Sequence, residues 1–241
     1  MKSGLERVEM GNRLGGAGVQ QICSDVGAYY GAQVTKYGAT PRGVDWSCQA
    51  TQSLRFVQLL RICDFAAPFA LNDVGCGYGA LCAFLDLRYP DSRVDYLGVD
   101  LSRAMISRAR RRFRRADRRF SIGKASPRLA DYSVASGVMN VNVGYSRAAW
   151  EDFIAAVLQD MRRTSRRGFS VNFMSDANGA SEASDNLPET RLYRTSPERW
   201  IPYCEDALGC SVETLENYGM KEFTLLLRCR QNLAEDLPLR H

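Results

Sequence analysis

The chain has 241 residues, 45% of them hydrophobic and 24% charged, and its formal net charge is +5 at pH 7. This length and composition predict one α/β domain with a sizeable core, and the apolar runs are too short and too often interrupted by charge to span a membrane. Eight cysteines without a Cys-x-x-Cys pair and one histidine, His241, argue against a metal site and predict a cytoplasmic protein with reduced thiols.

The N-terminal part is predicted to flank the core. Residues 1–23 include a glycine cluster, show no sustained hydrophobic period and lack the apolar stretch of a secretion signal, so we expect a flexible segment. Order is expected from Ser24, which can cap a helix, and residues 47–65 place apolar side chains at near-helical spacing. Residues 24–66 are therefore expected to form a helical lid or flank.

Strand and helix patterns alternate from residue 67 to residue 230, which predicts a doubly wound, mostly parallel α/β sheet. The last two strands are expected to pair antiparallel at the sheet edge, and residues 231–241 to form a tail. The segment 176–195 is rich in Gly, Ser, Asn and Asp. This composition indicates a long loop, which we expect to act as a lid that covers the acceptor. Strands are predicted at 70–74, 93–99, 120–123, 133–138, 169–174, 211–215 and 222–229, and helices at 80–89, 103–119, 150–162 and 196–208.

A glycine-rich turn follows the first of these strands. It reads Asp73-Val74-Gly75-Cys76-Gly77-Tyr78-Gly79, and its alternating glycines permit positive φ angles and the close approach of a ligand. Asp100 lies 21 residues past Gly79 and ends the next strand, where a carboxylate can accept hydrogen bonds from both hydroxyls of a ribose. The sequence therefore predicts a nucleotide pocket.

Two kinds of nucleotide fit this pattern. Gly75, Gly77 and Ala80 satisfy the Gly-x-Gly-x-x-(Gly/Ala) pattern of oxidoreductases that bind NAD. A dinucleotide site has no need of Asp73, two residues before the first glycine, whereas a ligand with an ammonium and a sulfonium group does. The residues favour such a ligand and leave the oxidoreductase as an alternative.

The segment from Asp73 to Gly79 resembles motif I of the class I S-adenosylmethionine-dependent methyltransferases, (Asp/Glu)-x-Gly-x-Gly-x-Gly, with every element present. Residues 98–102 are similar to the next family motif, and much of the chain from about residue 29 to 228 resembles stand-alone bacterial methyltransferases. The resemblance implies a Rossmann-like, seven-stranded sheet with an antiparallel last strand. It also implies S-adenosylmethionine as the donor and in-line transfer of its methyl group to N, O or S of a small metabolite.

The resemblance also assigns residues to parts of the donor. Asp73 is expected near the methionine amino group and Asp100 on the ribose, and Arg55 is expected to face the donor carboxylate. The family has Gly-Asp after the third strand, but this chain has Gly123-Lys124, so backbone groups nearby are expected to meet adenine instead. The implied donor-binding set is Tyr37, Trp46, Arg55, Asp73, Gly75, Cys76, Gly77, Tyr78, Gly79, Asp100, Leu101, Met105, Ala125, Ser126, Ser136 and Gly137.

The acceptor side is less well specified. Because the single histidine is the last residue, an alcohol acceptor would need another base, and Asp176 and Glu222 are the candidates. Asn140 follows the fourth strand and is expected to lead toward the acceptor. The sequence after this strand lacks the (Asn/Asp)-Pro-Pro-aromatic segment of adenine N6 methylation, and no cysteine lies between Cys82 and Cys204 for carbon-5 pyrimidine chemistry.

Nine arginines between Arg103 and Arg119 raise RNA or protein methylation as an alternative. On one helix, Met105, Ala109, Phe113, Ala116 and Phe120 would form an apolar stripe with the arginines facing solvent. No aromatic side chain is interleaved on that face to stack bases, so a small-molecule acceptor is favoured over nucleic acid. A homodimer and a non-catalytic donor-binding subunit remain open.

Overall fold

The computed structural model describes residues 15–46, 48–176 and 191–229. The start of the predicted flexible segment, most of the predicted acceptor lid and the predicted tail lie outside these residues. None of the helices in the described ranges is long and apolar enough to cross a membrane.

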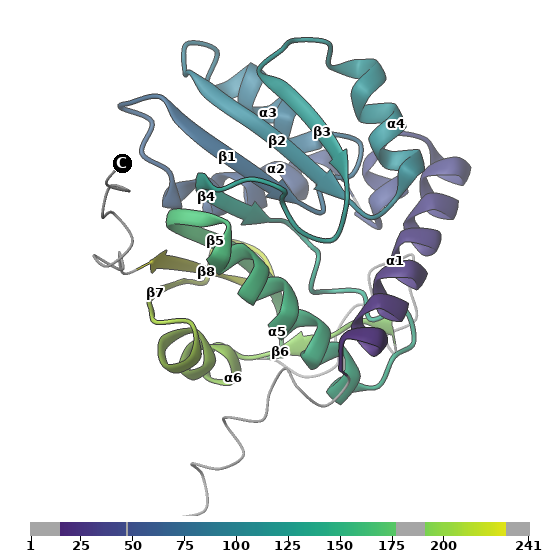
Figure 1. Cartoon of the computed structure of the whole chain (residues 1–241), viewed down its shortest axis with the longest axis vertical. Helices are drawn as coiled ribbons and strands as arrows, with labels where there is room; N and C mark the ends of the chain where they lie inside the picture. The colour runs from purple at the N-terminus through teal and green to yellow at the C-terminus, as the bar shows by residue number, and fades with distance from the viewer. Residues whose placement is uncertain (1–14, 47, 177–190, 230–241) are drawn as a thin grey trace, which may run out of the picture.

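One sheet organises the described part of the chain, with strand order β3-β2-β1-β4-β5-β8-β7 and the short β6 paired to β5 off this path (Figure 1). Neighbours from β3 to β5 are parallel, while β8 runs antiparallel to both β5 and β7. The predicted doubly wound sheet with an antiparallel closing strand is confirmed. The strands are β1 Phe69–Val74, β2 Val94–Asp100, β3 Arg118–Ile122, β4 Ala130–Ala135, β5 Ser165–Ser175, β6 Arg194–Thr195, β7 Cys210–Leu215 and β8 Glu222–Cys229.

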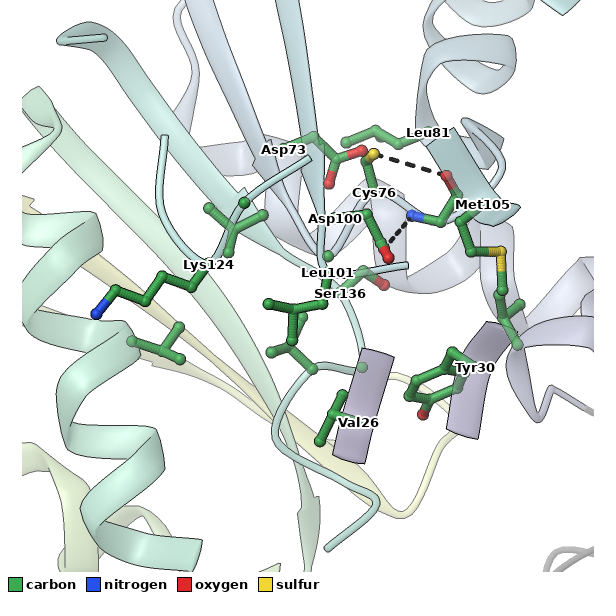
Figure 2. A pocket seen from close by; sticks show the side chains of 18 of the residues that line it. Val26, Tyr30, Asp73, Cys76, Leu81, Asp100, Leu101, Met105, Lys124 and Ser136 are labelled. Atoms are coloured by element: carbon green, nitrogen blue, oxygen red, sulfur yellow. Dashed lines mark hydrogen bonds between the residues drawn. The ribbon is translucent and has the colours of Figure 1, made fainter. Parts of the chain in front are cut away.

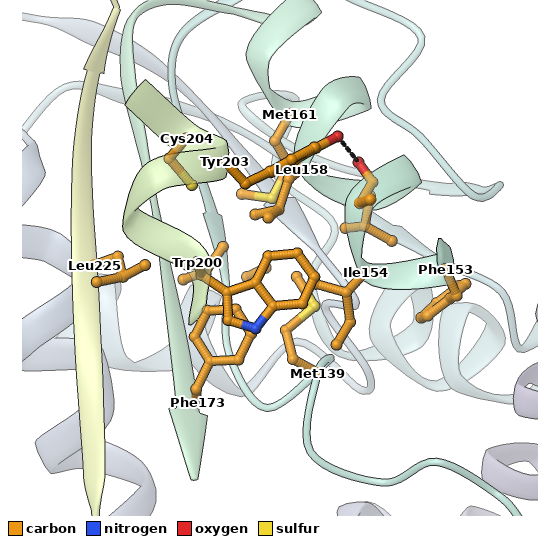
Figure 3. Close-up of a cluster of buried hydrophobic side chains, with 14 of the residues drawn as sticks. Met139, Phe153, Ile154, Leu158, Met161, Phe173, Trp200, Tyr203, Cys204 and Leu225 are labelled. Carbon is orange, nitrogen blue, oxygen red and sulfur yellow. Dashed lines mark hydrogen bonds between the residues drawn. The ribbon is translucent and has the colours of Figure 1, made fainter. Parts of the chain in front are cut away.

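Helices cover both faces because successive strand side chains point to opposite sides. Phe169, Val171 and Phe173 of β5 join the cluster under α5 (Arg147–Arg163) and α6 (Pro197–Pro202), where Phe173 stacks on Trp200 (Figure 3). Tyr132 and Val134 of β4 point the other way, toward α2 (Gln49–Leu59), α3 (Ala80–Arg88) and α4 (Arg103–Arg112). Two apolar layers therefore hold the sheet in place.

Helix α1 begins earlier than the sequence predicted. It runs from Gly15 to Tyr37 and packs beside α4, so residues 15–23 are helical where we expected a flexible segment (Figure 1). Ile22 is fully buried in the α5 cluster, and Val34 packs with the glycine turn and α4. Burial of this apolar stripe outweighs the low helix propensity of the glycines, each worth about 1 kcal/mol.

The predicted arginine helix is also shorter than expected. α4 ends at Arg112, and the chain then enters β3, which pairs in parallel with β2. Arg118 is buried in β3 and pairs with Asp86 at 2.7 Å. Met105 is buried on the helix as predicted, but the helix ends before Phe113. Strand pairing with β2 outweighs the local helical pattern in the rest of the segment.

Short helical turns and one short connection complete the fold. The turn η1 (Pro41–Val44) follows α1, η2 (Leu60–Ile62) follows α2, and a π-helix (Tyr203–Ala207) follows α6 where we predicted one continuous helix to residue 208. The connection from β3 to β4, residues 123–129, contains no helix. It therefore leaves space beside α5 at the carboxyl edge of the sheet.

Gly168 tests the contact between β5 and β8. A Cβ at this position would lie 2.4 Å from the backbone oxygen of Leu227, so Gly168→Ala should push the two strands apart. We expect a loss of about 1–3 kcal/mol in the free energy of unfolding, measured by denaturant titration. Gly16→Ala in α1 is the control, because nothing lies within 4 Å of its Cβ position, and it should leave stability equal or slightly raised. Equal stability of the two variants would contradict this packing.

Candidate active site

A cavity of about 1130 Å³, including its open mouth, lies at the carboxyl ends of β1, β2 and β4. In a doubly wound sheet, ligands bind at this edge, where the strand order reverses on either side of β1. The walls come from α1, the segment before α2, the glycine turn, the start of α4, the turn after β4, and α5. Figure 2 shows Asp73 and Asp100 on the strand side, with Val26 and Tyr30 of α1 lying away from Asp73.

The glycine turn needs its glycines for two separate reasons. Gly75, Gly77 and Gly79 have φ angles of 72°, 54° and 86°, in the left-handed region where a side chain is disfavoured. A Cβ on Gly75 would also lie 2.3 Å from the Val138 side chain, which belongs to the turn after β4. The backbone therefore comes close to its neighbours, and the cavity reaches it without an intervening side chain.

Asp100 fixes the shape of this turn. Its Oδ2 accepts a hydrogen bond from the Gly77 backbone N–H at 2.8 Å (Figure 2), and its Oδ1 accepts one from the Ser102 N–H at 2.8 Å. Burial raises the pKa of Asp100 to about 6, although these two N–H groups lower it. Each oxygen keeps a lone pair, so the carboxylate can still accept hydrogen bonds from a ligand in the cavity.

Asp73 is buried one strand away, at 2% exposure, and lines the same cavity. Burial raises its pKa to about 7, the hydrogen bond from the Tyr96 hydroxyl at 2.5 Å lowers it, and the charge of Asp100 raises it further. Neither acid has a cationic partner among the described residues. The two carboxyl groups therefore make this end of the cavity suited to a cationic ligand.

Two walls were not predicted from the sequence. Val19, Cys23, Val26 and Tyr30 of α1 line the cavity, and so do Phe153, Ala156, Val157 and Asp160 of α5. The α1 residues recur at spacings of four and three, which is a helical stripe visible in the sequence. The glycine cluster just before Val19 favoured the prediction of a flexible segment. Nothing comparable in the sequence indicates that α5 reaches the cavity.

The structure gathers most of the predicted donor-binding set. Five of its sixteen members do not line the cavity. Tyr37 is exposed at the end of α1, and Gly79 is the N-cap of α3. The other three are Arg55, Ala125 and Ser126. Gly123 and Lys124 line the wall in place of the two residues after them, with Lys124 on the opposite side from Met105 (Figure 2). The eleven on the wall are Trp46, Asp73, Gly75, Cys76, Gly77, Tyr78, Asp100, Leu101, Met105, Ser136 and Gly137.

The three predicted catalytic residues do not line this cavity. Asn140 is buried, and its side-chain oxygen accepts a hydrogen bond from the backbone N–H of Met174. Asp176 is exposed at the last described residue before the predicted lid. Glu222 is buried and forms an ion pair with Arg55. A general-base role for Glu222 is therefore not supported by its surroundings.

Comparison with known proteins places this chain in a family. A family model described as a methyltransferase domain matches residues 72–168. The Mycobacterium tuberculosis protein named "Putative methyltransferase Rv1506c" is 40% identical over 170 residues, which are 70% of this chain and 98% of that protein. This chain belongs to the class I S-adenosylmethionine-dependent methyltransferases. The glycine pattern that it shares with NAD-binding oxidoreductases is thereby assigned to the methyl donor.

Solved methyltransferases share the fold at low identity. Magnesium protoporphyrin IX methyltransferase (ChlM) from Synechocystis PCC 6803 with bound SAH gives a TM-score of 0.53 at 16% identity, covering 86% of each chain. The DhpI–SAH complex gives 0.58 at 15% identity over 87% of this chain and 98% of that one. The pyocyanin biosynthetic protein PhzM gives 0.55 at 16% identity over 82% and 64%. At these identities the likeness concerns the fold.

The cavity fits S-adenosylmethionine. The glycine turn offers a cradle that side chains would fill, and the buried carboxyl groups suit a donor that bears an ammonium and a sulfonium. The Ser136 hydroxyl is buried on the wall without a hydrogen-bond partner among the described residues, which leaves it available to a ligand. We infer that Asp100 would hold the ribose and that Asp73 would lie near the ammonium group.

The raised pKa of Asp73 predicts a pH dependence of stability. The folded protein holds this proton up to about pH 7, whereas the unfolded chain releases it near the ordinary value, so ionisation disfavours the folded state. Thermal unfolding of the ligand-free protein should therefore shift to lower temperature between pH 5 and pH 7. Asp73→Asn should flatten this slope in part, because Asp100 still contributes. The exposed Asp91→Asn should leave the slope unchanged. Equal slopes in all three proteins would contradict the assignment.

Proposed function

We propose that this methyltransferase transfers a methyl group to a nitrogen, oxygen or sulfur atom of a small metabolite. The observation that supports a small acceptor is the cavity itself, which is enclosed by α1, α5 and Trp46 and lined largely by apolar side chains. Apolar walls around a few convergent polar groups are typical of small-molecule sites. A structured RNA or a folded protein would have to enter past α1.

The chain's contribution to such a reaction is binding, orientation and exclusion of water. S-adenosylmethionine supplies an electrophilic methyl group on a sulfonium. A heteroatom lone pair forms the new bond to this carbon, the S–C bond breaks, and its electron pair stays on sulfur. Asp100 and the glycine turn would fix the donor, while Val26 and Tyr30 of α1 would cover it. The acceptor would approach from the side opposite the sulfur.

The cavity walls favour an acceptor that needs little help in losing its proton. Among the described residues that line it, the hydroxyl of Tyr30 and the thiol of Cys76 have pKa values raised well above normal by burial, so neither is a ready base. Asp73 and Asp100 are assigned to the donor, and the carboxylate of Asp160, which also lines the cavity, is paired with Arg163. An amine, a thiol or an acidic hydroxyl therefore suits this site better than an unactivated alcohol.

The related structures also support this proposal. ChlM is named as a methyltransferase of magnesium protoporphyrin IX and PhzM as a pyocyanin biosynthetic protein. The arginine-rich segment does not favour RNA, because α4 is a short helix on one side of the fold and Arg118, in β3, is paired internally with Asp86. We propose a cytoplasmic enzyme.

Transfer of labelled methyl groups tests the class of acceptor. The protein should be incubated with methyl-labelled S-adenosylmethionine and a cell extract separated into small molecules, RNA and protein. We expect label to enter the small-molecule fraction in an enzyme-dependent way, and Asp100→Ala to reduce the rate about tenfold or more because the donor loses a charged hydrogen-bond acceptor. Label that enters RNA or protein instead, and declines with added salt, would contradict the proposal.

A further inference from the structure

Arg55 and Glu222 form a buried pair that none of the predicted roles explains. Arg55 Nε donates to Glu222 Oε2 at 2.6 Å, and Arg55 Nη2 donates to Oε1, so the pair is bidentate. Both residues are 5% exposed, and they join α2 to β8 across 167 residues of sequence. Neither residue lines the cavity. The pair therefore holds something else in place.

One side of the pair leads to the turn after β4. Asn172 of β5 donates from Nδ2 to Glu222 Oε2 at 2.8 Å, and its Oδ1 accepts from the Gly137 backbone N–H at 2.8 Å. Asn172 is fully buried, and Gly137 has a φ of 76°. The orientation of this turn, which lines the cavity beside the glycine turn, is thus set by a side chain that is itself anchored on Glu222.

The other side of the pair leads to Trp46. The Arg55 guanidinium lies over the Trp46 ring, with its Cζ 3.5 Å from the ring centroid. The edge of the same indole meets the turn after β4, since a Cβ on Gly137 would lie 2.2 Å from Trp46 Cζ2. The contacts therefore close a circuit that runs through Gly137, Asn172, Glu222, Arg55 and Trp46. Only the indole and the turn reach the cavity.

We propose that Arg55 and Glu222 are positioning residues, which hold the Trp46 indole and the turn after β4 as the cavity wall over the methionine half of the donor. The proposal rests on the donor site described above. It replaces the expected roles of Arg55 as a ligand of the donor carboxylate and of Glu222 as a base. We place this wall at the methionine half because Val138, next to Gly137, meets Gly75, which is two residues from Asp73, the acid that we infer to lie near the donor's ammonium group.

The chemistry of the pair fits positioning better than stability. Burying two opposite charges costs desolvation that their attraction only partly offsets, so such a pair adds little net stability over apolar side chains of similar size. A guanidinium, however, can grip a carboxylate with two parallel N–H groups while its flat face stacks on an indole. A lysine ammonium can pair with the carboxylate only as a point charge, and it has no flat face to stack on the indole.

Tryptophan fluorescence gives a direct readout of this wall. Trp150 and Trp200 are fully buried, whereas Trp46 is half-buried and lines the cavity. S-adenosylhomocysteine, the demethylated donor, should change the emission of the wild-type protein in a saturable way. Trp46→Phe should remove that change and so assign it. In the double variant Arg55→Met with Glu222→Leu, we expect a dissociation constant about 3- to 10-fold higher, because the indole must then be ordered on binding.

Two further proteins keep this test decisive. Arg118→Met with Asp86→Leu removes another ion pair with a buried arginine, one that lies off the cavity, and should bind S-adenosylhomocysteine as the wild type does. If the Arg55 and Glu222 double variant does not fold, Arg55→Lys retains the charge but not the stacking face and should show the same weakened binding. A folded double variant, or a folded Arg55→Lys variant, with wild-type affinity and an unchanged Trp46 response would overturn the proposal. Absence of binding to the wild-type protein would instead refute the donor site itself.

Discussion

Two carboxyl groups at the ends of adjacent parallel strands, one buried and one half-buried, set the shape of this molecule's functional edge. Asp73 is buried and Asp100 is half-buried, and neither has a cation beside it in the described structure. Such groups must be hydrogen-bonded, and the donors here are the Tyr96 hydroxyl and the backbone N–H groups of Gly77 and Ser102. The glycine turn and the start of α4 are therefore held by the same acid that is assigned to the donor's ribose.

The rest of the cavity depends on elements that cover this edge. Helix α1 passes close to the end of β2, and the absence of a side chain at Gly27 permits this, since a Cβ there would lie 3.2 Å from the Leu101 carbonyl oxygen. The helix-free connection between β3 and β4 leaves space that α5 lines. The lining of the cavity is largely apolar, and its charged members are Asp73 and Asp100 at the strand ends, Lys124 after β3 and Asp160 of α5. This combination favours a cationic donor and a small acceptor.

The sequence allowed the sheet, the glycine turn and part of the cavity wall to be predicted, because these follow from local patterns. Gly75 and Asp100 have a fixed relation within one strand, turn, helix and strand unit. The partner of Arg55 could not be predicted. Glu222 reaches Arg55 only because β8 pairs antiparallel with β5, which joins residues 167 positions apart in the sequence. The sequence showed that Lys124 departs from the family pattern. Its position on the cavity wall depends on the conformation of the loop around it, which a local pattern does not specify.

Helix boundaries failed where tertiary contacts oppose local signals. The glycines near the start of α1 suggested flexibility, although burial of Ile22 stabilises the helix around it. The arginine-rich segment looked helical throughout, yet its last part pairs with β2 as a strand, and Arg118 finds a carboxylate in Asp86. In both cases the deciding interaction joins residues that are distant in sequence, which a local pattern does not contain.

Calorimetric titration with S-adenosylhomocysteine is the most direct measurement of the donor site. It compares the wild-type protein with Asp100→Ala and with Asp95→Ala, which lies on the same strand but points to solvent near Arg119. Our account predicts micromolar binding to the wild type and to Asp95→Ala, and affinity at least about tenfold weaker in Asp100→Ala. Equal affinity in all three proteins would contradict the assignment of Asp100, and with it the placement of the donor in this cavity.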